Sequence, residues 1–333
     1  MRYLQRVPQT EKLKTDAKDR KILGLLSANA RMPLTQLAKN VGLSRDAVKY
    51  RVTNYEKRGI IQGYRTLVDI SKFGYDNYHL FIKLNNPSKD VEQGILAKLT
   101  KHPFVRAILK FSGDYDFEVA FVAKGVAELD KKLTIMITDC AGSLQDYEIM
   151  TIVKTYAAET FPPDFLEMKG NYVKKVKKEM QPDEKDIEIL KVVAEDAQLP
   201  LFHIGNKVGL SADAVSYRLK NMLDSGVIVK FIPVINYVSL GYNLYTILLN
   251  MSALDEEREM RLKGFLLSDK NILWAVKTIG RFNVLIYVLV KDIDSLQDTL
   301  LSLRSLFPKQ INHYETLIAY EEYKYVYFPS DLF

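Results

Sequence analysis

Arg45 and Lys49 stand four residues apart in the segment VGLSRDAVKYR. On a helix, side chains at this spacing project from one face. There a guanidinium can bind a guanine edge or a phosphate, and an ammonium supplies a point charge. The segment recurs at positions 208–218 as VGLSADAVSYR, in which Ala212 and Ser216 replace the two cations. The sequence therefore predicts two similar helices, of which the first carries the charges that suit an anionic partner.

A second group that could do chemistry is the turn formed by Gly113, Asp114, Tyr115 and Asp116. Backbone N–H groups at a glycine can hold a carboxylate, and the two aspartates can hold an ammonium, as an α-amino acid requires. Gly and Asp also build ordinary β-turns, so a structural role remains open. In the second copy the turn reads GRFN, residues 280–283, without a carboxylate. We expect no equivalent site there, unless the two turns face each other and form one asymmetric site.

Other chemistries lack a suitable set of residues. The four histidines are scattered and show no metal-ligand spacing: His79, His102, His203 and His313. A single cysteine, Cys140, excludes an intrachain disulfide and fits a reducing compartment. The apolar runs are strand-length, and the first residues show no apolar core of a secretory signal. We therefore expect a cytoplasmic protein without a membrane segment, a metal, a cofactor or catalytic residues.

The whole chain is a repeat. One constant shift, which places Val41 on Val208, aligns its two halves without a gap from Asp16 onward. This repeat shift indicates a duplicated and fused unit. The charge differs between the copies. Residues 15–64 contain ten Lys or Arg and four Asp or Glu, whereas residues 182–231 contain six and eight. A basic surface of the kind that attracts nucleic acid is therefore expected in the first copy.

Each unit begins with three expected helices. In copy one they are residues 16–30, 34–43 and 45–58. Thr35 is expected to cap the second helix and Gly42 to end it, and Ser44 is expected to cap the third. Two helices joined by the short VGLS turn are typical of a helix-turn-helix. The strand-like residues 60–70 would then form a wing or a hinge strand.

Each unit continues as an alternation of strands and helices. In copy one the strands are expected at 78–84, 105–111, 116–123 and 146–154, and the helices at 88–101 and 126–138. This βαββαβ order predicts a ferredoxin-like sheet with both helices on one face. The other face is apolar and needs a cover, so we expect the two sheets to pair within one chain. The fold class is α+β: two tandem units, each a winged helix-turn-helix followed by a ferredoxin-like βαββαβ sandwich domain.

These patterns divide the chain into eight segments. They are an N-terminal extension (1–14), a winged helix-turn-helix (15–66), a hinge (67–76), a sandwich domain (77–166), a basic linker (167–181), a second winged helix-turn-helix with a degenerate recognition face (182–233), a hinge (234–243) and a second sandwich domain (244–333).

Residues 19–75 resemble the winged helix-turn-helix of the Lrp/AsnC (feast/famine) transcription regulators. The GDYDF motif inside βαββαβ resembles their regulatory, amino-acid-sensing RAM domain. The resemblance covers nearly the whole chain twice, whereas ordinary members carry one unit and dimerise through their sheets. It implies a regulator that binds double-stranded DNA, an amino-acid-like effector at Gly113, Asp114, Tyr115 and Asp116, and further copies of the chain, as a dimer of pseudo-dimeric chains.

In such a domain the third helix enters the major groove. The residues expected to bind DNA in copy one are Thr35, Gln36, Ser44, Arg45, Lys49, Tyr50, Arg51, Thr53, Asn54 and Lys57. A weaker set is expected in copy two: Ser216, Tyr217, Arg218 and Lys220. Arg51 and Arg218 occur in both copies and suit a structural ion pair equally well, in copy one with Glu56 or Asp19. We therefore predict that copy one does most of the DNA binding.

Two other functions remain open. One is an architectural or adaptor protein that binds DNA without an effector. The other is an enzyme similar to siroheme decarboxylases, which are built on the same two-domain unit. Such an enzyme needs basic and histidine side chains around a macrocycle between the sheets. No histidine of the sheet domains (His79, His102 and His313) recurs at the repeat shift, so the sequence favours the regulator.

Overall fold

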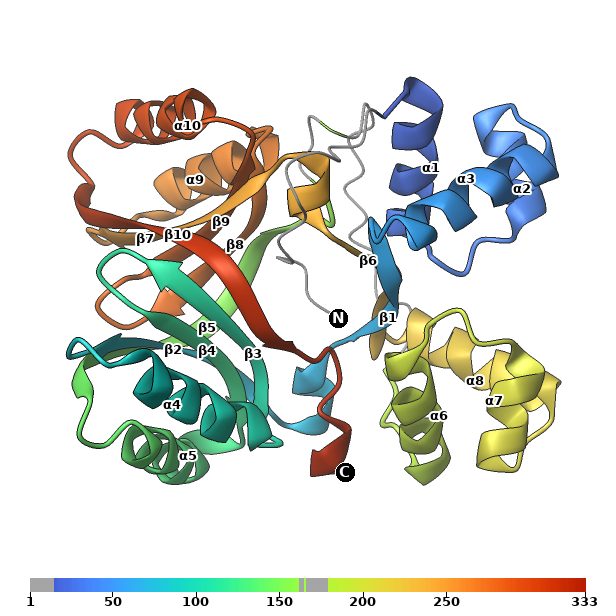
Figure 1. The fold of residues 1–333 in the computed structure, drawn as a ribbon, viewed down its shortest axis with the longest axis horizontal. Helices are drawn as coiled ribbons and strands as arrows, with labels where there is room; N and C mark the ends of the chain where they lie inside the picture. The colour runs from blue at the N-terminus through green and yellow to red at the C-terminus, as the bar shows by residue number, and fades with distance from the viewer. Residues whose placement is uncertain (1–14, 162–164, 166–178) are drawn as a thin grey trace.

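The structure is a computed structural model that describes residues 15–161, 165 and 179–333 (Figure 1). The expected N-terminal extension and most of the expected basic linker lie outside these residues. The described chain has two parts, a pair of helix-turn-helix domains and a barrel that both copies build together. No helix in these described ranges is long and apolar enough to cross a membrane.

Three helices form each helix-turn-helix domain. They are α1 (Ala17–Ala28), α2 (Leu34–Val41) and α3 (Arg45–Lys57) in copy one, and α6 (Glu184–Glu195), α7 (Leu201–Val208) and α8 (Ala212–Asp224) in copy two. Gly42 ends α2 in the left-handed conformation, with φ of 70°, and the Ser44 hydroxyl accepts a hydrogen bond from Ala47 N at 3.1 Å, as predicted. The expectation that Thr35 caps α2 is wrong. Pro33, whose fixed φ suits a helix start, occupies the N-cap, so Thr35 lies within the first turn.

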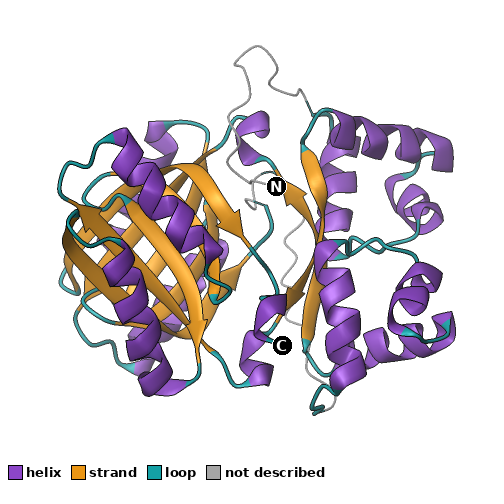
Figure 2. Ribbon diagram, turned by 60° about the horizontal axis from the view of Figure 1, so that its bottom comes forward, coloured by secondary structure: helices purple, strands orange, loops and turns teal. Residues whose placement is uncertain are grey.

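A two-stranded antiparallel ribbon joins the two helix-turn-helix domains. In it β1 (Ile61–Val68) pairs with β6 (Ile228–Ile235), with Arg65 opposite Ile232. Helix α1 packs on β6 and α6 packs on β1, so the first helix of each domain contacts the strand of the other copy. Figure 2 shows the ribbon lying between the helix-turn-helix helices and the barrel. The strands expected to form a wing or a hinge therefore hold the two domains together.

Each sheet follows the predicted βαββαβ order. Copy one contains β2 (Asp76–Leu84), α4 (Lys89–Lys101), β3 (Val105–Ser112), β4 (Phe117–Ala123), α5 (Gly125–Asp139) and β5 (Leu144–Ala158). Copy two contains β7 (Asn243–Met251), α9 (Glu256–Ser268), β8 (Ile272–Ile279), β9 (Val284–Val290), α10 (Ile293–Leu306) and β10 (Ile311–Tyr325). The 3-10 helices η2 (Ile70–Phe73) and η3 (Tyr237–Leu240) lead from the ribbon into the sheets, and η4 (Ser330–Leu332) follows β10. The strand orders β3-β4-β2-β5 and β8-β9-β7-β10 are ferredoxin-like.

The two sheets join at both edges into a closed barrel of eight strands. β5 pairs with β8 and β10 pairs with β3, so each seam joins one strand from each copy. Side chains alternate along the strands. Leu80 and Ile82 pack under α4 and α5, whereas Phe81 between them belongs to a different hydrophobic cluster on the other face of the sheet. The predicted pairing of the sheets within one chain is confirmed. Each terminal strand runs for 15 residues, longer than predicted, because its second half pairs across a seam.

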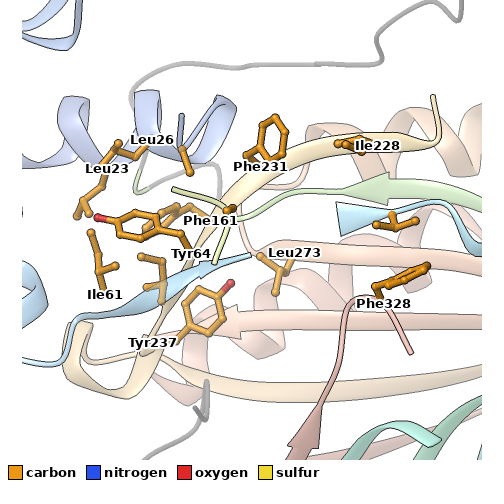
Figure 3. Packing of buried hydrophobic residues seen from close by; sticks show 14 of the residues in the cluster. Leu23, Leu26, Ile61, Tyr64, Phe161, Ile228, Phe231, Tyr237, Leu273 and Phe328 are labelled. Atoms are coloured by element: carbon orange, nitrogen blue, oxygen red, sulfur yellow. The ribbon is translucent and has the colours of Figure 1, made fainter. Parts of the chain in front are cut away.

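One hydrophobic cluster runs from both helix-turn-helix domains through the ribbon into the barrel. Figure 3 shows members of this cluster, including Leu26 of α1, Tyr64 of β1, Phe231 of β6 and Phe328 after β10. A side chain of the ribbon thus contacts the same core as side chains of the barrel. The DNA-binding candidates are therefore attached to the barrel by packing as well as by the chain.

Candidate nucleic-acid interface

The outer face of α3 carries the basic residues that the sequence singled out. Arg45 and Lys49 are exposed, and Tyr50 beside them has 74% of its surface accessible. Among the described residues, neither Arg45 nor Lys49 has an ion-pair partner. The helix thus presents a guanidinium, an ammonium and a phenol to the solvent at its N-terminal half, the part of a recognition helix that reads bases.

Helix α8 presents the equivalent face with different chemistry. Ala212 is half-buried, and Ser216 and Tyr217 are exposed, with 66% of the Tyr217 surface accessible. Lys220 is an exposed cation further along this helix. The tyrosine is thus the shared feature of the two faces, whereas the N-terminal pair of cations is confined to α3.

Arg51 and Arg218 tie their helices to the start of the same domain. Arg51 Nη1 lies 2.9 Å from Asp16 Oδ2 and 2.5 Å from Asp19 Oδ1, and Arg218 makes the same two contacts at 2.8 Å. In both copies these aspartates form the capping box of the first helix, and their hydrogen bonds raise the pKa of both guanidinium groups. The ion pair predicted with Asp19 is confirmed, whereas Glu56 accepts a hydrogen bond from a tyrosine hydroxyl of β1. Contact of either arginine with DNA stays a prediction.

The other predicted residues of copy one differ in exposure. Thr35, Gln36 and Lys57 are exposed. Thr53 and Asn54 on α3 are half-buried. The Ser44 hydroxyl is already engaged by the backbone of its own helix. The structure therefore leaves the exposed residues available for phosphates and gives Ser44 a structural role beside its predicted one.

A difference at the start of α7 was not predicted from the sequence. Phe202 and His203 stand where copy one has Thr35 and Gln36, and 63% of the Phe202 surface is accessible. Threonine and glutamine side chains can donate hydrogen bonds to phosphate oxygens, which phenylalanine cannot do. The alignment of the two copies already contained this signal. It strengthens the contrast between the two faces.

Hydrogen bonds between the copies fix the two helix-turn-helix domains relative to each other. Arg31 Nη1 donates to Ala197 O at 2.6 Å and to Leu199 O at 3.0 Å, and Gln198 Nε2 donates to Ala30 O at 2.8 Å. Together with the β1–β6 ribbon, these bonds make α3 and α8 parts of one body (Figure 1). A single chain therefore presents both recognition helices in a fixed relation.

Both aspartates of the expected effector turn have partners inside the protein. Asp114 Oδ1 lies 2.6 Å from Lys83 Nζ, and Asp116 Oδ2 accepts a hydrogen bond from Leu84 N at 2.6 Å. In copy two, Asn283 accepts the equivalent backbone hydrogen bond at 2.9 Å. The contact of Asp116 is thus retained without its charge, which supports a structural role for this carboxylate. The predicted effector contact of these residues stays a prediction.

The two turns lie at the same end of the barrel. A β-carbon on Gly113, whose φ is 150°, would lie 2.6 Å from Leu317 of β10, so this turn packs against copy two. Beyond it, Arg281 Nη2 of the second turn lies 3.6 Å from Glu315 Oε1. Tyr115 is buried, and burial together with Glu315 raises the pKa of its hydroxyl to about 12. Residues of both turns therefore meet around Glu315.

The histidines of the barrel do not converge. His79 is buried inside the barrel, His102 Nε2 lies 2.7 Å from Asp139 Oδ2 in the helical layer, and His313 is half exposed on β10. Within the described residues, no group of three or more His, Cys, Asp or Glu could hold a metal ion. The arrangement that a macrocycle-binding enzyme would need around several histidines is therefore not formed by these three.

One family model matches both halves of the chain, and known regulators match about a third of it. The family model described as winged helix-turn-helix DNA-binding matches residues 15–62 and 182–229. The HTH-type transcriptional regulator LrpA of Pyrococcus horikoshii is 38% identical over 100 residues, which are 30% of this chain and 70% of that protein. The regulatory protein AsnC of Haemophilus influenzae is 31% identical over 122 residues, which are 37% of this chain and 81% of that protein.

Among solved structures, the crystal structure of the siroheme decarboxylase NirDL is similar over most of the chain. It has a TM-score of 0.63 and 14% identity, and the alignment covers 93% of both chains. At this identity the likeness shows the fold alone, which is the tandem arrangement of two such units in one polypeptide.

Proposed function

The chain belongs to the Lrp/AsnC family of transcription regulators, and we propose that it regulates transcription by binding double-stranded DNA mainly through α3. The observation that carries this proposal is the difference between two equivalent helices. Arg45 and Lys49 extend from α3 into the solvent, whereas Ala212 and Ser216 occupy the same positions on α8. Arginine forks onto guanine and both cations attract phosphate, so α3 supplies base reading as well as affinity.

The fixed pair of domains gives each chain one strong and one weak DNA-binding helix. DNA seated on α3 extends toward α8, where Tyr217 and Lys220 can contact its backbone. The chain alone would then specify one half-site. An operator with two specific half-sites would need two chains, with the half-sites separated by whole helical turns. Assembly into a dimer of such pseudo-dimeric chains is part of this proposal.

Genome-wide recovery of bound DNA tests the proposal directly. The full-length chain is expected to enrich a short motif with one well-specified half, and the Arg45→Ala, Lys49→Ser variant is expected to lose the enrichment. The matched control is Ser216→Ala with Lys220→Ala, which changes the outer face of α8 and should keep the motif. Recovery of no motif by the unaltered chain would refute sequence-specific binding, and equal losses in both variants would refute the dominance of α3.

We also propose that a small amino-acid-like effector binds where the two turns meet. Glu315 Oε2 and Thr316 Oγ1 are buried without a hydrogen-bond partner among the described residues, on the stretch of β10 against which Gly113 packs. A ligand ammonium would satisfy Glu315, and Arg281, 3.6 Å from this residue, would attract a carboxylate. Because Asp114 is engaged by Lys83, the site depends on residues of copy two and is asymmetric.

Calorimetric titration with a panel of amino acids tests this effector site. Glu315→Gln is expected to weaken binding of the active compound at least about tenfold, because a charge-assisted hydrogen bond is lost. Glu256→Gln, an exposed change on α9, is the control and should leave binding unaltered. If no amino acid binds while DNA binding persists, the effector proposal fails and an effector-independent architectural or adaptor role is favoured.

Likeness in fold to NirDL favours an enzyme acting on siroheme as a second candidate function. Its support is weaker than that of the regulator, because His79, His102 and His313 lie in separate places. Addition of siroheme to the protein separates the two candidates. A bound-tetrapyrrole absorbance followed by loss of carboxyl groups would support the enzyme, and an unchanged spectrum would count against it.

A further inference from the structure

A polar cluster inside the barrel joins the two copies. Glu118 of β4 is buried and contacts His79 of β2, both from copy one. From copy two, the Tyr287 hydroxyl donates a hydrogen bond to Glu118 Oε1 at 2.5 Å. The Trp274 ring stacks on His79 with centroids 5.6 Å apart and lies 4.9 Å from the Tyr287 ring. We name these four residues the interior cluster; two come from each copy.

Burial fixes the protonation of the tyrosine in this cluster. Burial and the neighbouring Glu118 raise the pKa of Tyr287 well above its ordinary value, so the hydroxyl keeps its proton and remains a donor. Glu118 Oε2 has no hydrogen-bond partner among the described residues. The carboxylate therefore depends on His79 and Tyr287 for its buried hydrogen bonds, and loss of either partner is costly.

The interior cluster occupies one of two equivalent places in the barrel. The seams are related by the repeat shift: Lys154 lies opposite Lys277 at one, and Glu321 lies opposite Lys110 at the other. By the same shift, the counterparts of the cluster are small or apolar residues: Thr246 for His79, Leu285 for Glu118, Ala107 for Trp274 and Ala120 for Tyr287. These four positions thus carry large polar or aromatic side chains at one place and small or apolar side chains at the other, where Tyr325 of β10 lies opposite Ala107.

We infer that the interior cluster is a pairing-specificity device that makes the sheet of copy one accept the sheet of copy two and reject a second copy of itself. If two copy-one sheets paired between chains, Glu118 would face Ala120 and lose the tyrosine donor, and His79 would face Ala107. If two copy-two sheets paired, the Tyr287 hydroxyl would face Leu285 in place of its acceptor Glu118. A buried polar pair that is satisfied in one arrangement and unsatisfied in the others selects that arrangement.

This device has a consequence for the DNA-binding helices. In an exchanged dimer, two copy-one sheets would form one barrel and two copy-two sheets the other. Each helix-turn-helix domain leads directly into its sheet through η2 or η3. Exchange would therefore also pair the two basic copy-one domains with each other and the two non-basic copy-two domains with each other. The interior cluster therefore keeps one basic helix, with Arg45, and one non-basic helix, with Ala212, in every pair of helix-turn-helix domains.

Disulfide trapping at the seam measures the pairing in the full-length chain. Lys154→Cys with Lys277→Cys reports the native pairing, because these residues lie opposite each other within one chain. Lys154→Cys with Lys110→Cys reports exchange, because they would meet only between two copy-one sheets. The parent chain, with Cys140 alone, is the control; burial raises the pKa of this thiol to about 11, which keeps it unreactive. Each chain is unfolded, refolded at about 0.5 mM, near a typical tether's effective concentration, and oxidised.

Glu118→Leu with Tyr287→Ala removes the glutamate–tyrosine part of the preference, because every pairing then places leucine opposite alanine at these positions, and only the stacking of Trp274 on His79 still favours the native pairing. In this background the exchange reporter is expected to give at least about tenfold more interchain disulfide than in the unaltered cluster, where it should give almost none. The native reporter should still close within the chain, which shows that the variant folds. Equal interchain yields in the two backgrounds, including none in both, would overturn the inference.

A rescue variant separates specificity from stability. Adding Ala120→Tyr with Leu285→Glu rebuilds the glutamate–tyrosine pair at the equivalent place in the barrel, again across the two copies. Because this pair is satisfied only when copy one meets copy two, the interchain disulfide is expected to fall back toward its original level. An interchain yield that stays high in the relocated variant would show that the cluster contributes only stability.

Discussion

Arg218 Nη1 lies 2.8 Å from Asp186 Oδ1, and at the equivalent place in copy one Arg51 makes the same contact with Asp19. The pair persists in the copy that lacks the N-terminal cations, so its shared contribution is to hold the recognition helix against the first helix of the domain. Arg51 therefore differs in role from Arg45 and Lys49, although all three are cations on one recognition helix.

Arg218→Ala is expected to lower the free energy of unfolding by about 1–2 kcal/mol, because it removes charge-assisted hydrogen bonds to a buried and an exposed aspartate. The affinity for DNA should change little. Urea unfolding and a DNA-binding isotherm measure the two effects. Lys220→Ala, an exposed change on the same helix, is the stability control. A DNA-affinity loss with unchanged stability would assign Arg218 to the phosphate backbone instead.

Arg45→Ala with Lys49→Ser, which converts the face of α3 to that of α8, is expected to reduce DNA affinity by about 100-fold or more. If both cations contact phosphates, the slope of log affinity against log salt should also fall by about 1.8. Fluorescence anisotropy over a salt series measures both quantities. The reverse pair, Ala212→Arg with Ser216→Lys, should raise affinity and the slope. An unchanged slope in both variants would mean that neither face touches the DNA backbone.

The repeat and the local periodicities predicted most elements of this fold. The repeat shift and the spacing of apolar residues located the helices and strands, and Gly42 and Ser44 marked the ends of their helices correctly. These features depend on neighbouring residues. Thr35 failed as a cap because a preceding proline took that position, which shows the competition between two local signals.

The relations between the copies could not be predicted in detail. The opposition of Lys154 to Lys277 and of Arg65 to Ile232 joins strands that are far apart in the sequence, and no local pattern specifies such a register. The partners of Asp114 and Asp116 in the turn likewise come from β2. The sequence therefore identified which residues carry chemistry, but the contacts that engage or free them follow from tertiary packing.

Glu259 of α9 links the two copies at a seam and predicts a loss of stability in acid. Hydrogen bonds from Lys154, Lys277 and Tyr156 lower the pKa of Glu259 to about 2. A carboxyl whose pKa falls on folding stabilises the folded state above its unfolded value of 4.5, and this contribution disappears as the pH falls toward 2.

The difference in unfolding free energy between the unaltered chain and Glu259→Gln isolates this effect. It should be present at pH 7, shrink as the pH drops below 4.5 and vanish near pH 2. Urea titrations across this range measure it. Glu256→Gln, an exposed change in the first turn of the same helix, is the control and should give a small difference throughout. A difference for Glu259 that is independent of pH would exclude the ion pairs as its source.

Gly280 closes the barrel where the second turn meets β5, and no side chain fits there. Its φ is 153°, and a β-carbon would lie 2.7 Å from Ile149 O, a backbone atom that cannot move aside. Gly280→Ala is therefore expected to lower the free energy of unfolding by about 2 kcal/mol or more, through backbone strain and overpacking at the seam.

Gly264→Ala is the matched control for Gly280→Ala. Gly264 lies within α9 with nothing within 4 Å of a new β-carbon, so this change should stabilise the protein by about 0.5–1 kcal/mol. Thermal and urea unfolding of the two variants should move in opposite directions, and a stable Gly280→Ala chain would show that the seam yields by more than the observed packing allows.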